Sequence, residues 1–204
     1  METTPATEDR GYRLFGTDED IPFTESPVIH LPAFEQQRFD WGERIEARCS
    51  VDQLQLLQPL IETMSDELGL ILVLVASRNE LLKEGRYQSG TPVSREWLSS
   101  WLSGPLKDPL EQDGRCAVWV IDLRPGDGPR QIIWDRHDRF FVYGGAQGVR
   151  ETLAQVGLTE QPLPPLPTPH THRYHSRFDN AFDRVLSMPD WWVYSELRDE
   201  DAEL

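Results

Sequence analysis

Three short β-rich runs between residues 116 and 145 constrain the fold more than any other part of the sequence. The runs cover residues 117–123, 131–135 and 139–143. The first two are separated by Arg-Pro-Gly-Asp-Gly-Pro, and the last two by Arg-His-Asp. Runs of β-branched and aromatic residues joined by short turn segments are typical of consecutive antiparallel strands. The sequence therefore predicts a three-strand meander at about 117–143.

A seven-residue apolar run at 70–76 has no alternation of apolar and polar residues. This pattern is typical of a strand that is covered on both faces, so we expect it at the centre of the sheet. Apolar residues at helical spacing predict helices near 51–68, 95–103, 146–156 and 178–187. The order of these elements predicts an α+β fold: a single layered domain over 1–204, with a mostly antiparallel sheet packed by helices.

The helix predicted near 51–68 has a start signal and an internal complication. Ser50 followed by Gln53 resembles a capping box, and Gly69 is expected to end the helix. Pro59 lies inside the pattern, so the helix either kinks there or starts there. The apolar face of this helix is formed by Leu54, Leu57, Ile61, Met64 and Leu68. For the next helix, Ser94 is the expected N-cap, and Trp97 and Trp101 are expected to face the core.

The segments that flank these elements have their own compositions. Residues 1–49 contain short apolar pieces interrupted by prolines, which favours edge strands or an extended N-terminal arm. Residues 161–169 are proline-rich and must be extended, which favours a strap across the surface. A last strand or packed tail follows at 191–194, and residues 198–204 form an acidic tail.

The charge balance restricts the class of partner. The chain has 35 Asp and Glu against 20 Lys and Arg, a formal net charge of -15. Such a surface repels a phosphate backbone, so no nucleic acid is expected, whereas a basic protein would be attracted. The first residues contain no secretory signal, and the apolar runs are too short to span a membrane, so we expect a cytoplasmic protein. The two cysteines form neither a disulfide framework nor a CxxC site.

Catalytic motifs are missing, and one histidine cluster is the candidate for metal chemistry. The sequence contains no GxSxG, GxxxxGK[ST] or GxGxxG motif, so no cofactor is expected. His170 and His172 form an HxH pair whose rings share a face of an extended segment, and His175 could complete a three-nitrogen site. Asp135 or Asp138, beside His137, could add a carboxylate. The other interpretation is that the histidines only hydrogen-bond the proline strap and the next helix.

Two further clusters are interpreted conservatively. Residues 134–138, Trp-Asp-Arg-His-Asp, have the side chains of an acid–base site, but at a hairpin tip we expect a solvated turn. Residues 144–148, Gly-Gly-Ala-Gln-Gly, precede a helix and could hold an anion, although a tight turn explains them equally well.

No family motif is matched residue by residue, but the overall character is similar to that of bacterial immunity proteins. These are small, acidic α+β proteins without an active site, and the resemblance implies inhibition of a basic toxin or enzyme by direct binding. A DNA mimic would need more evenly spaced acids. The alternative is a metal-dependent enzyme that uses the 170–175 histidines. The expected partner-binding residues are Asp18, Glu19, Asp20, Trp191, Trp192, Asp199, Glu200 and Asp201.

Overall fold

The computed structural model describes residues 14–17, 25–27, 29–40, 42–50, 52–77, 83–104, 106–167, 170–172, 174–186, 192–199 and 201. Within these ranges the chain forms a nine-stranded sheet, a separate three-stranded sheet and five α-helices. Neighbouring strands of the large sheet are antiparallel, except for the parallel pair β10 and β3. The predicted α+β class, a mostly antiparallel sheet packed by helices, is confirmed.

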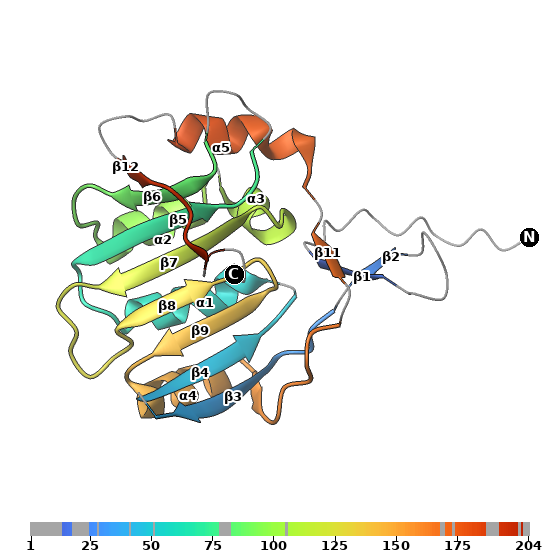
Figure 1. The fold of residues 1–204 in the computed structure, drawn as a ribbon. Helices are drawn as coiled ribbons and strands as arrows, with labels where there is room; N and C mark the ends of the chain where they lie inside the picture. The colour runs from blue at the N-terminus through green and yellow to red at the C-terminus, as the bar shows by residue number, and fades with distance from the viewer. Residues whose placement is uncertain are drawn as a thin grey trace, which may run out of the picture.

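The large sheet brings together strands from almost the whole length of the chain (Figure 1). In spatial order its strands are β10 (Thr159–Glu160), β3 (Ala33–Phe39), β4 (Gly42–Arg48), β9 (Arg139–Tyr143), β8 (Gln131–Trp134), β7 (Cys116–Asp122), β5 (Leu68–Leu74), β6 (Gly85–Ser89) and β12 (Trp192–Ser195).

The predicted meander is present as β7, β8 and β9, paired in sequence order. The predicted apolar strand is β5, whose seven residues are all buried and which pairs with β7 and β6. Its side chains contact the main core on one face and a smaller cluster around Val73 and Ala117 on the other. Burial on both faces explains the lack of alternation. However, β5 is not the middle strand, because that position belongs to β8.

Three helices cover one face of the sheet: α1 (Gln53–Glu62), α2 (Arg95–Leu102) and α4 (Ala146–Gln155) (Figure 1). As predicted, Ser94 caps α2, because its hydroxyl accepts from the Trp97 amide. The Trp97 side chain does not face the core as predicted: it is 38% exposed and stacks on Trp101. The short helix α3 (Lys107–Gln112) and the strand β6 were not predicted.

The boundaries of α1 differ from the prediction at both ends. Ser50 is not the N-cap, because its hydroxyl accepts from the His30 amide; Asp52 occupies the cap position with a φ of 54°. Pro59 lies inside a helix that continues past it, which settles the question that the sequence left open. The helix ends at Glu62, and Leu68 begins β5. Met64 and Leu68 are buried, so they fit an apolar spacing without being helical.

Part of the N-terminal region belongs to the large sheet and is not an extended arm. β3 and β4 form a hairpin, and β4 also pairs with β9, so β4 is an interior strand of the large sheet. The prediction of edge strands is therefore wrong for β4. Its residues 45–48 are buried, although they alternate between apolar and charged side chains, because both faces of the sheet are covered at this point.

A separate three-stranded sheet lies beside the large sheet (Figure 1). It consists of β1 (Leu14–Thr17) between β2 (Glu25–Pro27) and β11 (His170–His172), all antiparallel. The proline-rich segment leads to β11 along the edge of the large sheet. There the Gln161 amide donates to the Phe34 carbonyl at 2.9 Å, and the Leu163 amide donates to Glu35 at 3.2 Å.

The chain after β11 forms a 3₁₀ turn (Ser176–Phe178) and α5 (Asp179–Leu186), and returns to the large sheet as β12 beside β6. The predicted helix near 178–187 and the predicted last strand are both present. No helix in the described part of the chain is long and apolar enough to cross a membrane.

Candidate metal centre

The turn between β8 and β9 is buried, which corrects the expectation of a solvated hairpin tip. Asp135 is fully buried, and Arg136, His137 and Asp138 are each at most 7% exposed. Asp138 adopts a left-handed conformation with a φ of 59°, and its carboxylate accepts from the buried Gln53 amide. A turn held in this way can position side chains accurately, because its own polar groups are bound within the protein.

Asp135 organises the turn. Its Oδ1 accepts from the backbone amides of His137 and Arg139, each at 2.9 Å. Its Oδ2 lies 3.0 Å from His137 Nδ1 and accepts from Arg139 Nε at 2.6 Å. Burial alone would raise the pKa of Asp135, but the hydrogen bond from His137 and the charge of Arg139 hold the pKa below its ordinary value. The carboxylate is therefore charged at neutral pH and fixes the His137 ring.

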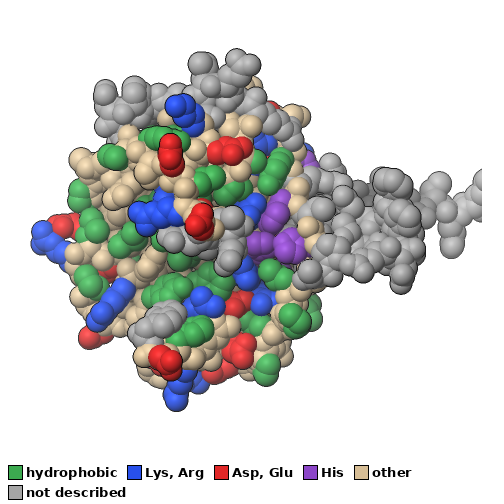
Figure 2. Space-filling model, viewed as in Figure 1, with side chains coloured by type: hydrophobic (Ala, Val, Ile, Leu, Met, Phe, Trp, Pro, Cys, Tyr) green, Lys and Arg blue, Asp and Glu red, His purple; other side chains and the backbone are tan. Residues whose placement is uncertain are grey.

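Three histidines from two sheets converge at this turn. His137 belongs to the turn of the large sheet, whereas His170 and His172 lie on β11. One ring nitrogen from each of the three lies within 4.8 Å of the other two. The ring centroid of His137 is 5.1 Å from that of His170 and 4.7 Å from that of His172. His137 is buried, whereas His170 and His172 are half-buried. Figure 2 shows histidine side chains at the surface with basic side chains beside them.

The hydrogen bonds of the outer ring nitrogens define two of the tautomers. His137 Nδ1 faces the charged Asp135 carboxylate at 3.0 Å, which requires a proton on that nitrogen. Arg139 Nη2 also lies 3.2 Å from this nitrogen. His170 Nδ1 lies 2.9 Å from the Pro167 carbonyl oxygen and must also carry a proton. In neutral rings, Nε2 of His137 and of His170 then both present lone pairs.

These two Nε2 atoms lie only 3.2 Å apart. Two lone pairs at this distance repel each other unless a proton or a metal ion lies between the atoms. Nitrogens bound at about 2.0–2.1 Å to a tetrahedral zinc ion are separated by about 3.3–3.4 Å. The observed separation of 3.2 Å is close to this nitrogen–nitrogen distance. A carboxylate or a backbone carbonyl behind each ligating ring is also the usual outer shell of a histidine metal site.

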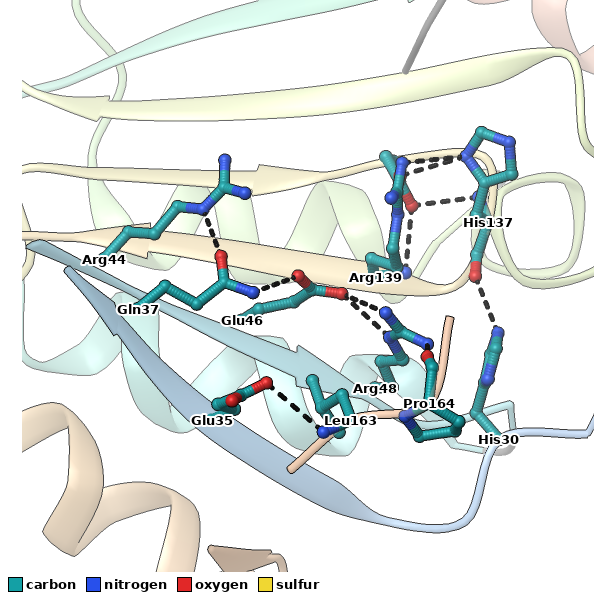
Figure 3. Close-up of polar contacts among 11 residues, drawn as sticks. His30, Glu35, Gln37, Arg44, Glu46, Arg48, His137, Arg139, Leu163 and Pro164 are labelled. Atoms are coloured by element: carbon teal, nitrogen blue, oxygen red, sulfur yellow. Dashed lines mark hydrogen bonds and ion pairs between the residues drawn. The ribbon is translucent and has the colours of Figure 1, made fainter. Parts of the chain in front are cut away.

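The environment keeps the His137 ring neutral. Burial lowers the pKa of His137, Asp135 raises it, and two neighbouring arginines lower it further, so that the net direction is downward. His30 supports the turn from behind, because its Nε2 lies 3.1 Å from the His137 carbonyl oxygen. Burial, with the charge of Arg48, lowers the pKa of His30 to about 4, so this ring is a neutral donor. Figure 3 shows His30 and Arg139 around His137.

A chain of polar contacts joins β3 and β4 to the proline-rich segment (Figure 3). Arg44 donates to Gln37, and Gln37 donates to Glu46 at 2.9 Å. Glu46 forms a buried ion pair with Arg48 at 2.6 Å, and Arg48 donates to the Pro164 carbonyl. This network fixes the chain shortly before His170.

His175, the third histidine of the sequence-based candidate, lies outside the cluster. Its backbone amide donates to Asp113 at 2.7 Å, and its ring packs edge-on against Phe178. His137 takes the place that was predicted for His175. Asp135, an expected carboxylate ligand, instead orients His137 from behind. His137 lies 33 residues before His170 in the sequence, and only the folded structure brings the two side chains together.

The predicted partner-binding residues differ in their burial and in whether the structure describes them. Asp18, Glu19, Asp20, Trp191 and Glu200 lie outside the described residues. Trp192 is buried, and its ring nitrogen donates to the Val185 carbonyl at 2.9 Å. Asp201 is fully buried and forms a bidentate pair with Arg86. Asp199 is exposed. Of the described candidates, therefore, Asp199 is available to a partner, whereas Trp192 and Asp201 are engaged within the chain.

The comparisons with known proteins add no further constraint. The chain matches no protein-family model, no curated protein and no solved structure.

Proposed function

We propose that this protein binds a divalent transition-metal ion through one ring nitrogen each of His137, His170 and His172. The observation that carries the proposal is the 3.2 Å separation of two Nε2 atoms whose partner nitrogens are both engaged by acceptors. A third ring nitrogen lies within 4.8 Å of both, so a small side-chain adjustment completes the set.

The ligand set favours zinc and its neighbours over hard cations. Imidazole nitrogen suits zinc, copper, nickel and cobalt, whereas magnesium and calcium require oxygen ligands. Three histidines leave one position of a tetrahedral ion for water or an exogenous ligand, and a zinc-bound water ionises near neutral pH. The proposal is thus a nitrogen-rich site with an open position, which is the coordination that supports hydrolytic chemistry in other proteins.

The proposal is tested with untagged protein that has been stripped with a chelator and titrated with Zn²⁺ by calorimetry. We expect one equivalent to bind, and His137→Ala or His172→Ala to weaken binding by more than about 100-fold, the upper range for loss of an outer-shell partner. His175→Ala is the matched control, because this ring lies outside the cluster, and should bind as tightly as the unmodified protein. Equal affinity in all four proteins, or no binding in any, overturns the proposal.

A second candidate function is binding of a basic protein, as the resemblance to immunity proteins implies. Beyond the net charge of -15, its support is the edge strand β12. Val193 and Tyr194 on this strand are 59% and 41% exposed, and the exposed acids Glu196 and Asp199 follow it. An edge strand can pair with an extended segment of a partner, and nearby carboxylates would favour a basic one. In this proposal the partner is a basic toxin or enzyme domain that is neutralised by occlusion.

This second candidate is tested by capturing partners from the native cell and measuring association kinetics of the captured protein. Raising salt from 50 to 500 mM should slow association at least ~10-fold, because exposed charges are screened beyond a Debye length of ~4 Å. Changing Asp18, Glu19 and Asp20 to Asn, Gln and Asn should reproduce part of that loss at low salt. Val193→Asp should accelerate dissociation. Kinetics that respond to none of these changes exclude this mode of binding.

A further inference from the structure

The small sheet is too short to be stable without docking. Its strands β1, β2 and β11 have four, three and three residues. Strands in globular proteins usually have about five or six residues, and small sheets need an apolar face or packing partner to persist. The order of β1 and β2 must therefore depend on what holds the small sheet in place.

β11 is held near both of its ends by contacts outside the small sheet. Before it, Pro164 is bound by Arg48 of β4. After it, the His175 carbonyl accepts from Arg115 at 2.9 Å, and the His175 amide donates to Asp113. Within the described residues, β1 is bound to the rest of the molecule by its pairing with β11 and carries β2 on its other edge.

The histidines of β11 sit at the junction between the two sheets. His172 is opposite Leu14 in β1, and His170 is opposite Gly16. Because residues two apart on a strand point to the same face, both rings are directed to one side, where they contact His137 of the large sheet.

We infer that the metal ion acts as a clip that joins the small sheet to the large sheet, so that the order of β1 and β2 depends on metal occupancy. This inference rests on the proposed metal site and assigns it a conformational role. Its physical basis is linkage. If opening of the small sheet separates His137 from His170 and His172, the open form loses the three-ligand site. Metal then reduces the open population by a factor of 1 + [metal]/Kd.

The experiment is amide hydrogen exchange of the full chain, with and without Zn²⁺, after Kd has been measured by calorimetry. At free Zn²⁺ of 100 times Kd, exchange at residues 14–17 should slow by about 100-fold. The pairing of β12 with β6 lies on the far edge of the large sheet and serves as an internal control whose exchange should not change. His175→Ala should behave like the unmodified protein.

The outcomes separate the clip from the metal site itself. In His172→Ala, Zn²⁺ should no longer slow exchange at 14–17, even at a concentration that saturates the unmodified protein. If one equivalent of Zn²⁺ binds and exchange at 14–17 is unchanged, the clip is wrong and the metal site stands. If calorimetry detects no binding, both fall. If exchange slows equally in β1 and in the β12 pairing, metal stabilises the whole molecule and the clip is again wrong.

Discussion

At the scale of single residues, the candidate site depends on groups that bind no metal themselves. Asp135 holds the His137 ring by Nδ1, and the Pro167 carbonyl does the same for His170. Each contact leaves the opposite nitrogen available, so outer-shell groups determine which atoms converge. The sequence showed the HxH pair but could not show this arrangement, because a side chain's tautomer depends on neighbours that are distant along the chain.

Asp135→Asn tests this dependence. The amide group would present donors to His137 Nδ1 and Arg139 Nε, both of which are donors already. We expect Zn²⁺ affinity to fall about 10–100-fold. The loss of a buried charged partner should also lower the free energy of unfolding by about 3–5 kcal/mol. Calorimetry and urea denaturation measure the two effects.

Asp138→Asn is the matched control for that variant. Asp138 is equally buried, but its φ of 59° suits Asn, and an amide oxygen can still accept from Gln53. Asp138→Asn should lower the free energy of unfolding by less than about 1 kcal/mol and leave metal affinity unchanged. Similar losses in both variants would show that Asp135 has no special role in orienting the ligand.

Asp122 is one of the buried carboxyl groups that make stability depend on acid. Burial raises the pKa of Asp122, but hydrogen bonds from the hydroxyl and amide of Ser65 outweigh it and hold the pKa below its ordinary value. A depressed pKa stabilises the fold above the unfolded value of about 3.9, and this stability is lost as pH falls through the folded pKa. Ser65→Ala should raise the pKa of Asp122, measured by NMR, and make unfolding less sensitive to acid below about pH 4. An unchanged acid dependence would remove Ser65 from this account.

At the scale of elements, local pattern predicted strands better than helix ends. The meander and β5 were predicted because runs of β-branched residues between turn segments have few other interpretations. The pattern places the end of α1 too late, because Met64 and Leu68 are buried at a helical spacing although neither belongs to the helix. β4 was underestimated because its buried Glu46 and Arg48 satisfy each other, and a sequence does not show that charges are paired.

Leu72→Asp tests the interior position of β5. Leu72 is fully buried, and an unpaired carboxylate there costs several kcal/mol out of about 5–15 kcal/mol for a typical domain. We expect this variant to be unfolded by circular dichroism. Gln88→Asp, on the neighbouring strand β6 and exposed, should fold and melt close to the unmodified protein. A folded Leu72→Asp protein with an unchanged melting temperature would contradict the assignment of β5 to the core.

At the scale of the whole molecule, the acidic composition conceals several different roles for carboxylates. Figure 2 shows acidic and basic side chains interspersed on the viewed face, so the net charge is not gathered there into one acidic patch. Asp135 and Asp201 are fully buried and paired with arginines, whereas Asp199 is exposed. Composition predicts the sign of the average field. It does not separate solvated acids from structural ones, because that depends on which cation the fold brings nearby.

The final prediction separates two acids that the sequence treated alike. Asp201 pairs with Arg86, whose guanidinium also lies over the Trp119 ring, and joins the C-terminal segment to β6. Asp201→Ala removes a buried partner of Arg86 and should lower the free energy of unfolding by about 3–5 kcal/mol. Asp199→Ala, two residues away and exposed, should change it by less than about 0.5 kcal/mol. Denaturant titration measures both, and loss of the β12 pairing should appear in Asp201→Ala as faster amide exchange at residues 192–195. Equal stabilities would mean that the buried pair of Asp201 with Arg86 adds no net stability and does not hold β12 in place.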